Sequence, residues 1–322
     1  MTREIDGGSD GVGPAAGQPT SSLRLLRGGR SSRNLAKRAR EASVFSFIAP
    51  ALAILLVFRV WPLVSAFRLS LTRWNGLTQP SYVGLRNYRH LWGDQRFRDA
   101  LLNNIKLLAI LPVWVFLPFL IAQALFNKVL GWRFFRIAFF LPAVLSPVVL
   151  GIYYGLVLRP DGPLNRGLGA VGLGSGDRDW LNDPRTAFPI MAAILVWSTF
   201  GVGVLIFLAG FSNLDQQFLE AAKIDGATWF QAQRYVVFWL MLPVVRFWSV
   251  IILIVSFTGV FPLVYALTRG GPGNSTYVVE FDIYQEAFQK SALGYSSAIG
   301  IALLVFVVLL LAILTRILRQ RV

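Results

Sequence analysis

A short polar segment, Glu220-Ala221-Ala222-Lys223-Ile224-Asp225-Gly226-Ala227, lies between two long apolar runs. It offers two carboxylates, Glu220 and Asp225, beside alanines small enough for another surface to approach the backbone closely. Side chains of this kind suit contact with a partner, because the carboxylates supply charge and the short side chains leave room. An ordinary amphipathic helix at a lipid surface has the same periodicity, so spacing alone leaves both interpretations open.

The residues before this segment predict the start of a short helix. Asn213 or Asp215 can cap its first turn, because their side-chain oxygens accept from free backbone amides. Leu214, Phe218 and Ala222 then fall at i, i+4 and i+8, on one face.

The end of this helix and the start of the next are also predicted. Glu220 can pair with Lys223 at i+3. Gly226 is a natural stop, because glycine takes a positive φ at little cost. Thr228 can cap a second helix that runs towards the next apolar run.

The composition predicts an all-α integral membrane protein. Apolar residues make up 55% of the 322 residues, and the mean hydropathy is +0.58. Charged residues make up 15%, against roughly 25% in ordinary soluble domains. The apolar residues come in runs long enough to cross a bilayer. The chain has no cysteine, which excludes disulfides, thiol catalysis and cysteine metal sites.

The net charge of +15 suggests nucleic-acid binding, but its distribution argues against it. Eight basic residues lie in the first 43, and others flank the apolar runs. Basic residues beside spans are typical of membrane orientation and lipid-headgroup contact. We therefore expect membrane lipid, and no nucleic acid, among the partners.

Two regions are expected along the chain. Residues 1–42 predict a disordered, basic, cytoplasmic tail. Residues 43–322 predict one transmembrane domain, with a polar loop at about 212–235 between the fourth and fifth spans. The six expected spans are 44–71, 101–126, 137–158, 188–211, 244–267 and 297–314.

The basic residues of short loops predict the orientation. The tail, the turn after the second span and the C-terminus are basic, and six spans place all three on one side. We expect that side to be the cytoplasm of a prokaryotic cell, with both termini inside. The residues concerned include Lys128, Arg133, Arg136, Arg316, Arg319 and Arg321.

The polar segment resembles the EAA loop of permeases in ATP-binding-cassette (ABC) importers. In that family the loop forms the coupling helix, which docks into a cleft on the ATPase subunit. One feature departs from the family pattern: the downstream Leu-Pro pair is Leu242-Pro243, about four positions late, so we expect a longer connecting helix. The matching residues are Glu220, Ala221, Ala222, Asp225, Gly226 and Ala227.

Other segments resemble one subgroup, the MalF-like permeases of sugar importers. The segment Tyr82–Tyr88 is similar to the outer-loop pattern "fvGLxNY" of that subgroup, and Thr268–Thr276 is similar to its "GGPxxsT" pattern. The segments Ile283–Phe288 and Gly294–Ala298 continue the match. The resemblance covers the chain from about Phe45 and implies the type I bundle of six helices.

The resemblance also implies partners and a mode of action. Such a chain works with a second, non-identical permease subunit, two ATPase subunits and an extracytoplasmic solute-binding protein, and it passes a sugar across the plasma membrane. ATP is bound by the partner subunits, so this chain is expected to be no enzyme and to hold no cofactor. Consistently, the sequence has no G-x-x-x-x-G-K-[ST] phosphate loop, no catalytic set and no metal-ligand spacing.

The residues that contact the cargo stay unassigned. Aromatic rings and polar side chains in or near spans suit a sugar, but anchoring and packing explain each of them better. A glycerol phosphate or another polar solute remains open as the cargo. The candidates are Trp114, Tyr153, Tyr154, Trp197, Tyr265, Asn103, Asn104, Gln123 and Ser256.

Arg59 is the most unusual residue within a span. An unpaired cation there costs about 2.5 kcal/mol or more. Either Arg59 faces the bundle interior or a water-filled path, or its side chain extends to the outer interface and the true span ends near it.

An ion-driven secondary transporter is the main alternative class. Such proteins usually bury carboxylates at mid-membrane, and no Asp or Glu falls within the expected spans.

Overall fold

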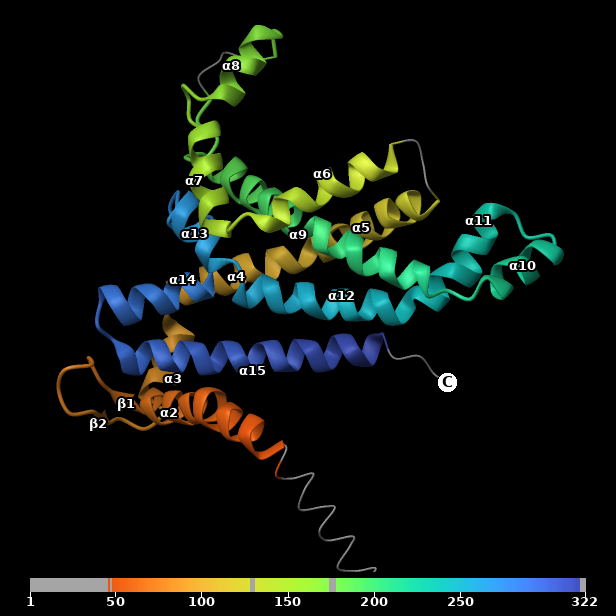
Figure 1. Ribbon diagram of the computed structural model, residues 1–322. Coiled ribbons are helices and arrows are strands. Elements are labelled where there is room, and N and C mark those ends of the chain that lie inside the picture. Colours follow the sequence, from red (N-terminus) through yellow and green to blue (C-terminus); the bar gives the residue numbers. More distant parts are fainter. Residues whose placement is uncertain (1–45, 47, 128–130, 174–177, 319–322) are drawn as a thin grey trace, which may run out of the picture. The chain divides into compact units, whose positions relative to one another are not determined.

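The computed structural model describes residues 46, 48–127, 131–173 and 178–318 (Figure 1). The expected tail, residues 1–42, lies outside the described residues. The chain divides into two units, Met1–Pro62 and Leu63–Val322, and each is described by itself.

The first span is a helix of 23 residues, Ile48–Ser70. Its turn η1 (Leu56–Val60) has π geometry, and α2 (Trp61–Ser70) continues it. Arg59 lies in the π turn, midway along the helix, with an exposed side chain. The helix continues for eleven more residues beyond Arg59, to Ser70.

A small ribbon follows this span. Strands β1 (Thr72–Arg73) and β2 (Ser81–Tyr82) pair antiparallel, with Thr72 opposite Tyr82. The short helix α3 (Arg86–Gly93) comes next. Its successor α4 begins where the Asp94 carboxylate accepts from the amide of Arg96.

Long helices make up most of the second unit (Figure 1). The helix of the second span, Gln95–Phe126, consists of α4 and α5, which meet at Ile110 just before Pro112. Helix α5 packs against α9, and so does α6. The elements after α3 that contribute to the spans are α4 (Gln95–Ala109), α5 (Leu111–Phe126), α6 (Trp132–Val144), α7 (Pro147–Val157), α9 (Pro184–Ser212), α12 (Phe238–Thr258) and α15 (Leu293–Ile317).

Shorter elements connect the long helices, and they carry the surface features considered below. They are α8 (Pro163–Ala170), α10 (Gln216–Ile224), α11 (Trp229–Ala232), the π turn η2 (Gln233–Val237), α13 (Phe261–Leu267), α14 (Val279–Tyr284) and the π turn η3 (Gln285–Gln289).

The expected third span, 137–158, corresponds to a bent pair of helices rather than to one continuous helix. Its two parts, Ile137–Val144 and Pro147–Val157, meet at an angle of 103°. The cause is Ser146, which is extended at ψ 138°, because the ring of Pro147 disfavours helical backbone in the preceding residue.

The expected fifth span, 244–267, is wrong at both ends. The helix begins at Trp229, where polar residues lower the hydropathy, and it ends at Thr258. Gly259 follows, and the separate helix α13 begins at Phe261, with Pro262 in its first turn. The sixth span runs three to four residues beyond 297–314 at each end, as Leu293–Ile317. The all-helical membrane bundle itself is confirmed.

Glycines let these helices approach closely. A Cβ on Gly201 of α9 would lie 2.3 Å from the carbonyl oxygen of Phe139 on α6. A Cβ on Gly151 of α7 would lie 2.6 Å from the Cβ of Ala266 on α13. Small residues at helix contacts are typical of membrane bundles, where packing replaces the hydrophobic effect.

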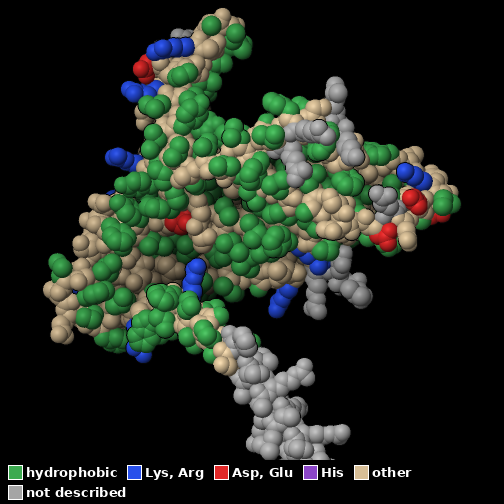
Figure 2. Space-filling model, viewed as in Figure 1, with side chains coloured by type: hydrophobic (Ala, Val, Ile, Leu, Met, Phe, Trp, Pro, Cys, Tyr) green, Lys and Arg blue, Asp and Glu red, His purple; other side chains and the backbone are tan. Residues whose placement is uncertain are grey.

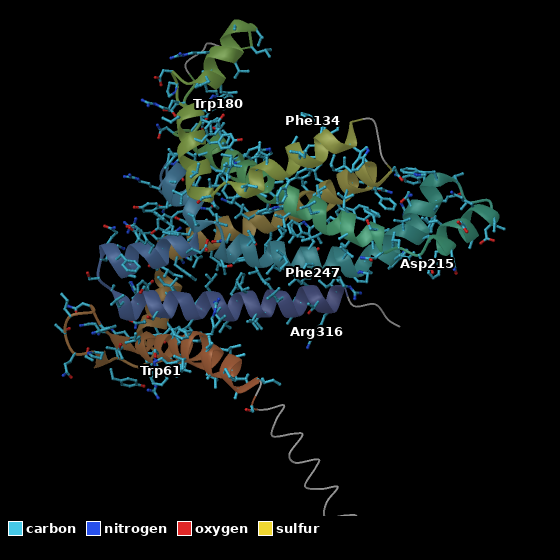
Figure 3. All side chains as sticks on the ribbon, viewed as in Figure 1. Trp61, Phe134, Trp180, Asp215, Phe247 and Arg316 are labelled. Carbon is cyan, nitrogen blue, oxygen red and sulfur yellow. The ribbon has the colours of Figure 1, made fainter. Side chains whose placement is uncertain are left out.

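Apolar side chains also cover most of the face shown in Figure 2, and charged ones gather near α8 and α10. Figure 3 shows exposed Phe134 on α6 and Phe247 on α12 among them. Such a surface is suited to lipid or to neighbouring subunits.

Candidate functional site

The segment singled out in the sequence forms a helix, a tight turn and a second helix at one end of the second unit (Figure 1). Figure 3 shows Asp215 at this end. Asp215 caps α10 by accepting from the amide of Gln217 at 3.0 Å, so one of the two predicted caps is confirmed. Asn213 instead donates its side-chain amide to the carbonyl of Ala209.

The turn after α10 is locked by two backbone hydrogen bonds. The amide of Ala227 donates to the carbonyl of Ala222 at 2.9 Å, and the amide of Gly226 donates to that of Lys223 at 3.1 Å. This is the Schellman pattern, which requires a left-handed residue after the helix. Gly226 supplies it at φ 78°, as predicted.

The second helix starts with a reciprocal cap. Thr228 accepts from the amide of Gln231, and the Gln231 side chain accepts from the amide of Thr228 at 2.8 Å. The predicted cap at Thr228 is thereby confirmed. From Trp229 the chain continues as one helix to Thr258, through the π turn η2.

The prediction that Leu214, Phe218 and Ala222 form one apolar face of α10 is partly wrong. Ala222 is buried and Leu214 is half-buried, but Phe218 is 53% exposed. Leu219 takes its place and packs against the apolar core. The face therefore follows an i, i+3 step from Leu219 to Ala222 rather than the i, i+4 step from Phe218.

The predicted contact residues lie mostly on the open side of this turn. Glu220, Ala221, Asp225 and Gly226 are exposed, and Ala227 is half-buried. Among the ion pairs of the described residues, none joins Glu220 to Lys223. The carboxylate of Glu220 is consequently available to another molecule.

Exposed apolar side chains surround this polar turn. Ile224 is 85% exposed, and Trp229, Phe230 and Tyr235 are also largely exposed. Exposed apolar groups beside charged ones are common where a second protein binds. The arrangement offers recognition chemistry: carboxylates, an open backbone and aromatic anchors.

Several residues considered as sugar contacts have structural roles instead. Asn103 donates to the carbonyls of Asn274 and Tyr277, and Asn104 donates to that of Ser256. The indole of Trp114 donates to Thr199 at 2.6 Å, and Gln123 donates to Gln233. The hydroxyl of Ser256 donates to the carbonyl of Leu253.

The remaining aromatic candidates are at least partly exposed. Tyr153, Trp197 and Tyr265 are exposed, and the ring of Tyr154 meets that of Trp197 edge-on at 5.8 Å. These side chains do not converge with the five buried ones on a common cavity among the described pockets.

A buried polar cluster at the other end was missed in the sequence. The hydroxyl of Tyr277 donates to the carboxylate of Asp282 at 3.0 Å, and Asp282 is fully buried. Burial raises the pKa of Asp282 to about 6. Burial also raises the pKa of Glu280 to about 7, against the opposing effect of hydrogen bonds from the amides of Val260 and Phe261. These acids lie outside the apolar runs, so hydropathy gave no signal for them.

Arg246 was also missed. It lies on α12, and its Nε and Nη2 atoms are buried without a hydrogen-bond partner in the described structure. The predicted span began at Val244, which placed Arg246 at a membrane edge. In the observed helix, Trp229–Thr258, Arg246 lies away from both ends.

The chain matches the family described as "Binding-protein-dependent transport system inner membrane component" over residues 91–322. The chain belongs to this family. It is accordingly a permease subunit of the ABC importer type, and the resemblance to MalF-like permeases is confirmed.

Named relatives agree with this membership. The chain is 32% identical to the multiple sugar-binding transport system permease protein MsmF of Streptococcus mutans, over 82% of this chain and 90% of the relative. It is 31% identical to the arabinooligosaccharides transport system permease protein AraP of Bacillus subtilis, over 84% and 86%. The lactose transport system permease protein LacF of Rhizobium radiobacter is 29% identical, over 87% and 95%.

The fold is that of a solved importer. A crystal structure of a bacterial ABC transporter involved in the import of the acidic polysaccharide alginate superposes with a TM-score of 0.75. The identity is 21%, and the match covers 90% of this chain and 99% of the other.

Proposed function

We propose that this chain imports a carbohydrate across the plasma membrane, as one of two non-identical permease subunits. Two ATPase subunits, which bind the ATP, and an extracytoplasmic solute-binding protein complete the assembly. The relatives named for sugar, arabinooligosaccharide and lactose transport support carbohydrate as the cargo class. The chain itself hydrolyses no ATP.

The observation that carries the coupling role is the exposed turn from Glu220 to Ala227. Its backbone is fixed by the Schellman bonds, while Glu220 and Asp225 stay exposed. A docked partner can move the bundle only if its contacts favour one conformation over another. Because α11 continues into α12 without a break, displacement of this turn is transmitted to a span. The side that carries α10, and both termini, are cytoplasmic in this proposal.

Co-purification with the ATPase subunits tests the proposal. Glu220→Ala removes the exposed charge, and Gly226→Pro removes the left-handed stop, since proline fixes φ near −65°. We expect weaker assembly or ATP hydrolysis uncoupled from uptake. Asp161→Asn, an exposed carboxylate at a distant loop, is the matched control. Normal assembly and uptake in both site variants would remove the coupling role.

A further inference from the structure

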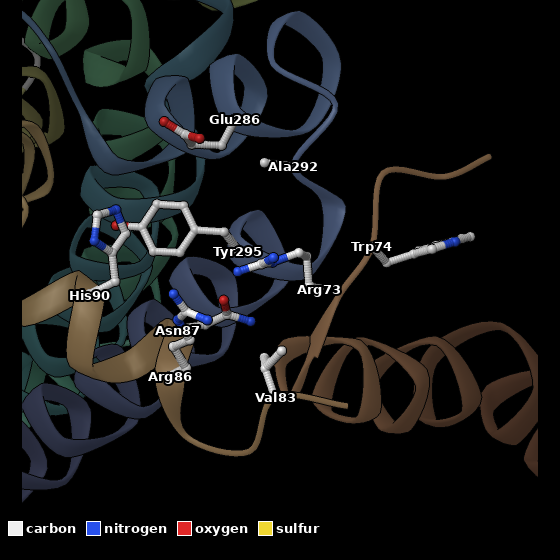
Figure 4. Close-up of a pocket in the computed structure, with 9 residues that line it drawn as sticks. All are labelled: Arg73, Trp74, Val83, Arg86, Asn87, His90, Glu286, Ala292 and Tyr295. Carbon is white, nitrogen blue, oxygen red and sulfur yellow. The ribbon is translucent and has the colours of Figure 1, made fainter. Parts of the chain in front are cut away.

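A polar pocket of about 390 Å³ lies at the ribbon end of the second unit. Residues from four elements line it: Arg73 of β1, Arg86 and His90 of α3, Glu286 of η3, and Tyr295 of α15. Figure 4 shows the side chains of Arg73 and Arg86 directed towards the same space, with the ring of Tyr295 behind them.

The walls of this pocket are fixed by hydrogen bonds between segments far apart in sequence. The side chain of Asn87 donates to the carbonyls of Ser70 at 2.7 Å and Thr72 at 2.9 Å. The amide of Gly294 donates to the carbonyl of Trp74 at 3.2 Å. A Cβ on Gly294 would lie 2.1 Å from the carbonyl oxygen of Thr72, so only glycine lets α15 meet the ribbon. The cavity is therefore preformed.

The acidic groups around the pocket are already engaged. Glu286 forms an ion pair with Lys290. Asp94 accepts from the hydroxyl of Tyr295 at 2.7 Å, and hydrogen bonds from that hydroxyl and from backbone amides outweigh burial and lower the pKa of Asp94. His90 lies against the Tyr295 ring, with centroids 4.9 Å apart.

The two arginines, in contrast, have no ion-pair partner among the described residues. Both are exposed at the mouth of the cavity. A guanidinium carries a planar set of donors that matches the two oxygens of a carboxylate. Arg73 and Arg86 therefore form a site suited to an anion with two oxygens in one plane, such as a carboxylate.

The ribbon and the loop after it also expose apolar side chains outside the lining of the pocket. Leu77 is 92% exposed, Tyr82 is 78% exposed and Leu85 is 62% exposed, all on the ribbon or the loop after it. Tyrosine and arginine are enriched among the residues that contribute most to protein–protein binding. Figure 1 shows the ribbon beyond the first turn of α15, away from the long apolar part of that helix. This position favours a soluble protein over a lipid headgroup as the ligand.

The pocket also lies opposite the α10 turn. The chain crosses from α10 and α11 to η3 through the single long helix Trp229–Thr258. One crossing separates the two sites, so a partner that docks at α10 cannot reach the pocket. If α10 is cytoplasmic, the pocket faces the extracytoplasmic side.

We infer that the Arg73–Arg86 pocket receives an Asp or Glu side chain of the extracytoplasmic solute-binding protein. This inference rests on the proposed function, since it needs an importer with such a partner. The carboxylate bonds to the two guanidinium groups at the mouth of the pocket.

Binding of the solute-binding protein to the assembled transporter tests the inference. The transporter is placed in nanodiscs of zwitterionic lipid, and the affinity is measured over a salt series. We expect the double variant Arg73→Gln/Arg86→Gln to bind at least tenfold more weakly, with a shallower salt dependence. Arg89→Gln is the matched control, because Arg89 is an exposed arginine of α3 that does not line the pocket.

Three outcomes overturn the inference. One is an unchanged affinity in the double variant, and another is an equal loss in Arg89→Gln. The third is an effect that appears only in nanodiscs with anionic lipid, which would assign the arginines to headgroups. Co-purification of the ATPase subunits is checked in the same samples. If the parent chain recruits no ATPase, the proposed function fails; if recruitment is normal but the double variant docks normally, only the pocket assignment fails.

Discussion

The side-chain amide of Asn104 donates to the backbone carbonyl of Ser256 at 2.7 Å, joining α4 to α12. The oxygen of the same side chain accepts from the amide of Val279 at 3.0 Å, at the start of α14. Asn104 is fully buried, so three segments depend on one amide.

Asn104→Leu should destabilise the fold by about 2–4 kcal/mol, because a buried carbonyl and a buried amide both lose their partner. Thermal unfolding followed by tryptophan fluorescence measures this, and the ten tryptophans supply the signal. Asn75→Ala, at the exposed tip of the ribbon, is expected to cost less than about 1 kcal/mol. Similar losses in the two variants would contradict the assignment.

Gly201→Ala should separate α6 from α9. The added methyl group would meet the Phe139 carbonyl at 2.3 Å, and overpacking of this kind costs about 1–3 kcal/mol. Gly155→Ala on α7 is the control, since no atom lies within 4 Å of its Cβ position. There alanine should stabilise the helix by up to about 1 kcal/mol. If the two variants shift the melting temperature in the same direction, the close contact between α6 and α9 is refuted.

Gly226 can be tested for its backbone conformation alone, because its added Cβ would meet nothing within 4 Å. Asparagine tolerates the left-handed region, whereas β-branched valine does not. We therefore expect Gly226→Asn to keep most ATP-coupled uptake and Gly226→Val to lose most of it. Uptake measured in proteoliposomes with the ATPase subunits distinguishes them. Equal uptake by the two variants would show that the turn geometry does not matter.

Asp282→Asn should stabilise the protein at neutral pH. The folded pKa of about 6 lies above the ordinary 3.8, so stability present below pH 4 is lost as the pH rises to 6. That difference in pKa corresponds to about 3 kcal/mol. The melting temperature of the variant should exceed that of the parent at pH 7.5 and approach it at pH 5.

The control for this pH dependence is Asp161→Asn, since Asp161 is exposed. Glu280, with a pKa of about 7, destabilises parent and variant alike as the pH rises, so its effect cancels in the difference. A melting-temperature gap that is the same at both pH values would show that Asp282 is not the group responsible.

Arg246→Met should raise the melting temperature, since methionine removes two buried donors that have no acceptor. Uptake by the same variant separates two roles. A more stable protein with unchanged uptake would show that Arg246 destabilises the fold and takes no part in transport. Reduced uptake would show that Arg246 contributes to transport. A lower melting temperature would mean that Arg246 has a partner in the assembled transporter. Arg234→Met on η2 is the control.

The sequence predicted the long helices and the α10 turn because their signals are local. Apolar runs, the Asp215 and Thr228 caps and the left-handed Gly226 each depend on a few adjacent residues. The π turns, the packing of Leu219 in place of Phe218, and the exact ends of the spans depend on tertiary contacts.

The polar features at the ribbon end could not be predicted from neighbouring residues either, because their contacts join segments far apart in the sequence. The Arg73 pocket joins segments more than 200 residues apart, from Trp74 to Gly294. Asn103 and Asn104 looked available for cargo because their partners lie about 170 residues downstream. Hydropathy ranks such residues by type and carries no information about which backbone groups they will meet.

The hydrogen bond from the amide of Gly294 to the carbonyl of Trp74 also bears on how often the chain traverses the bilayer. Both groups must lie at the same membrane surface, so an even number of traverses separates them. Among the described residues, three long apolar helices lie between them: Gln95–Phe126, Pro184–Ser212 and Trp229–Thr258. If each of these three helices crosses the bilayer, the angled pair of α6 and α7 supplies the fourth traverse, as a broken span rather than a re-entrant hairpin.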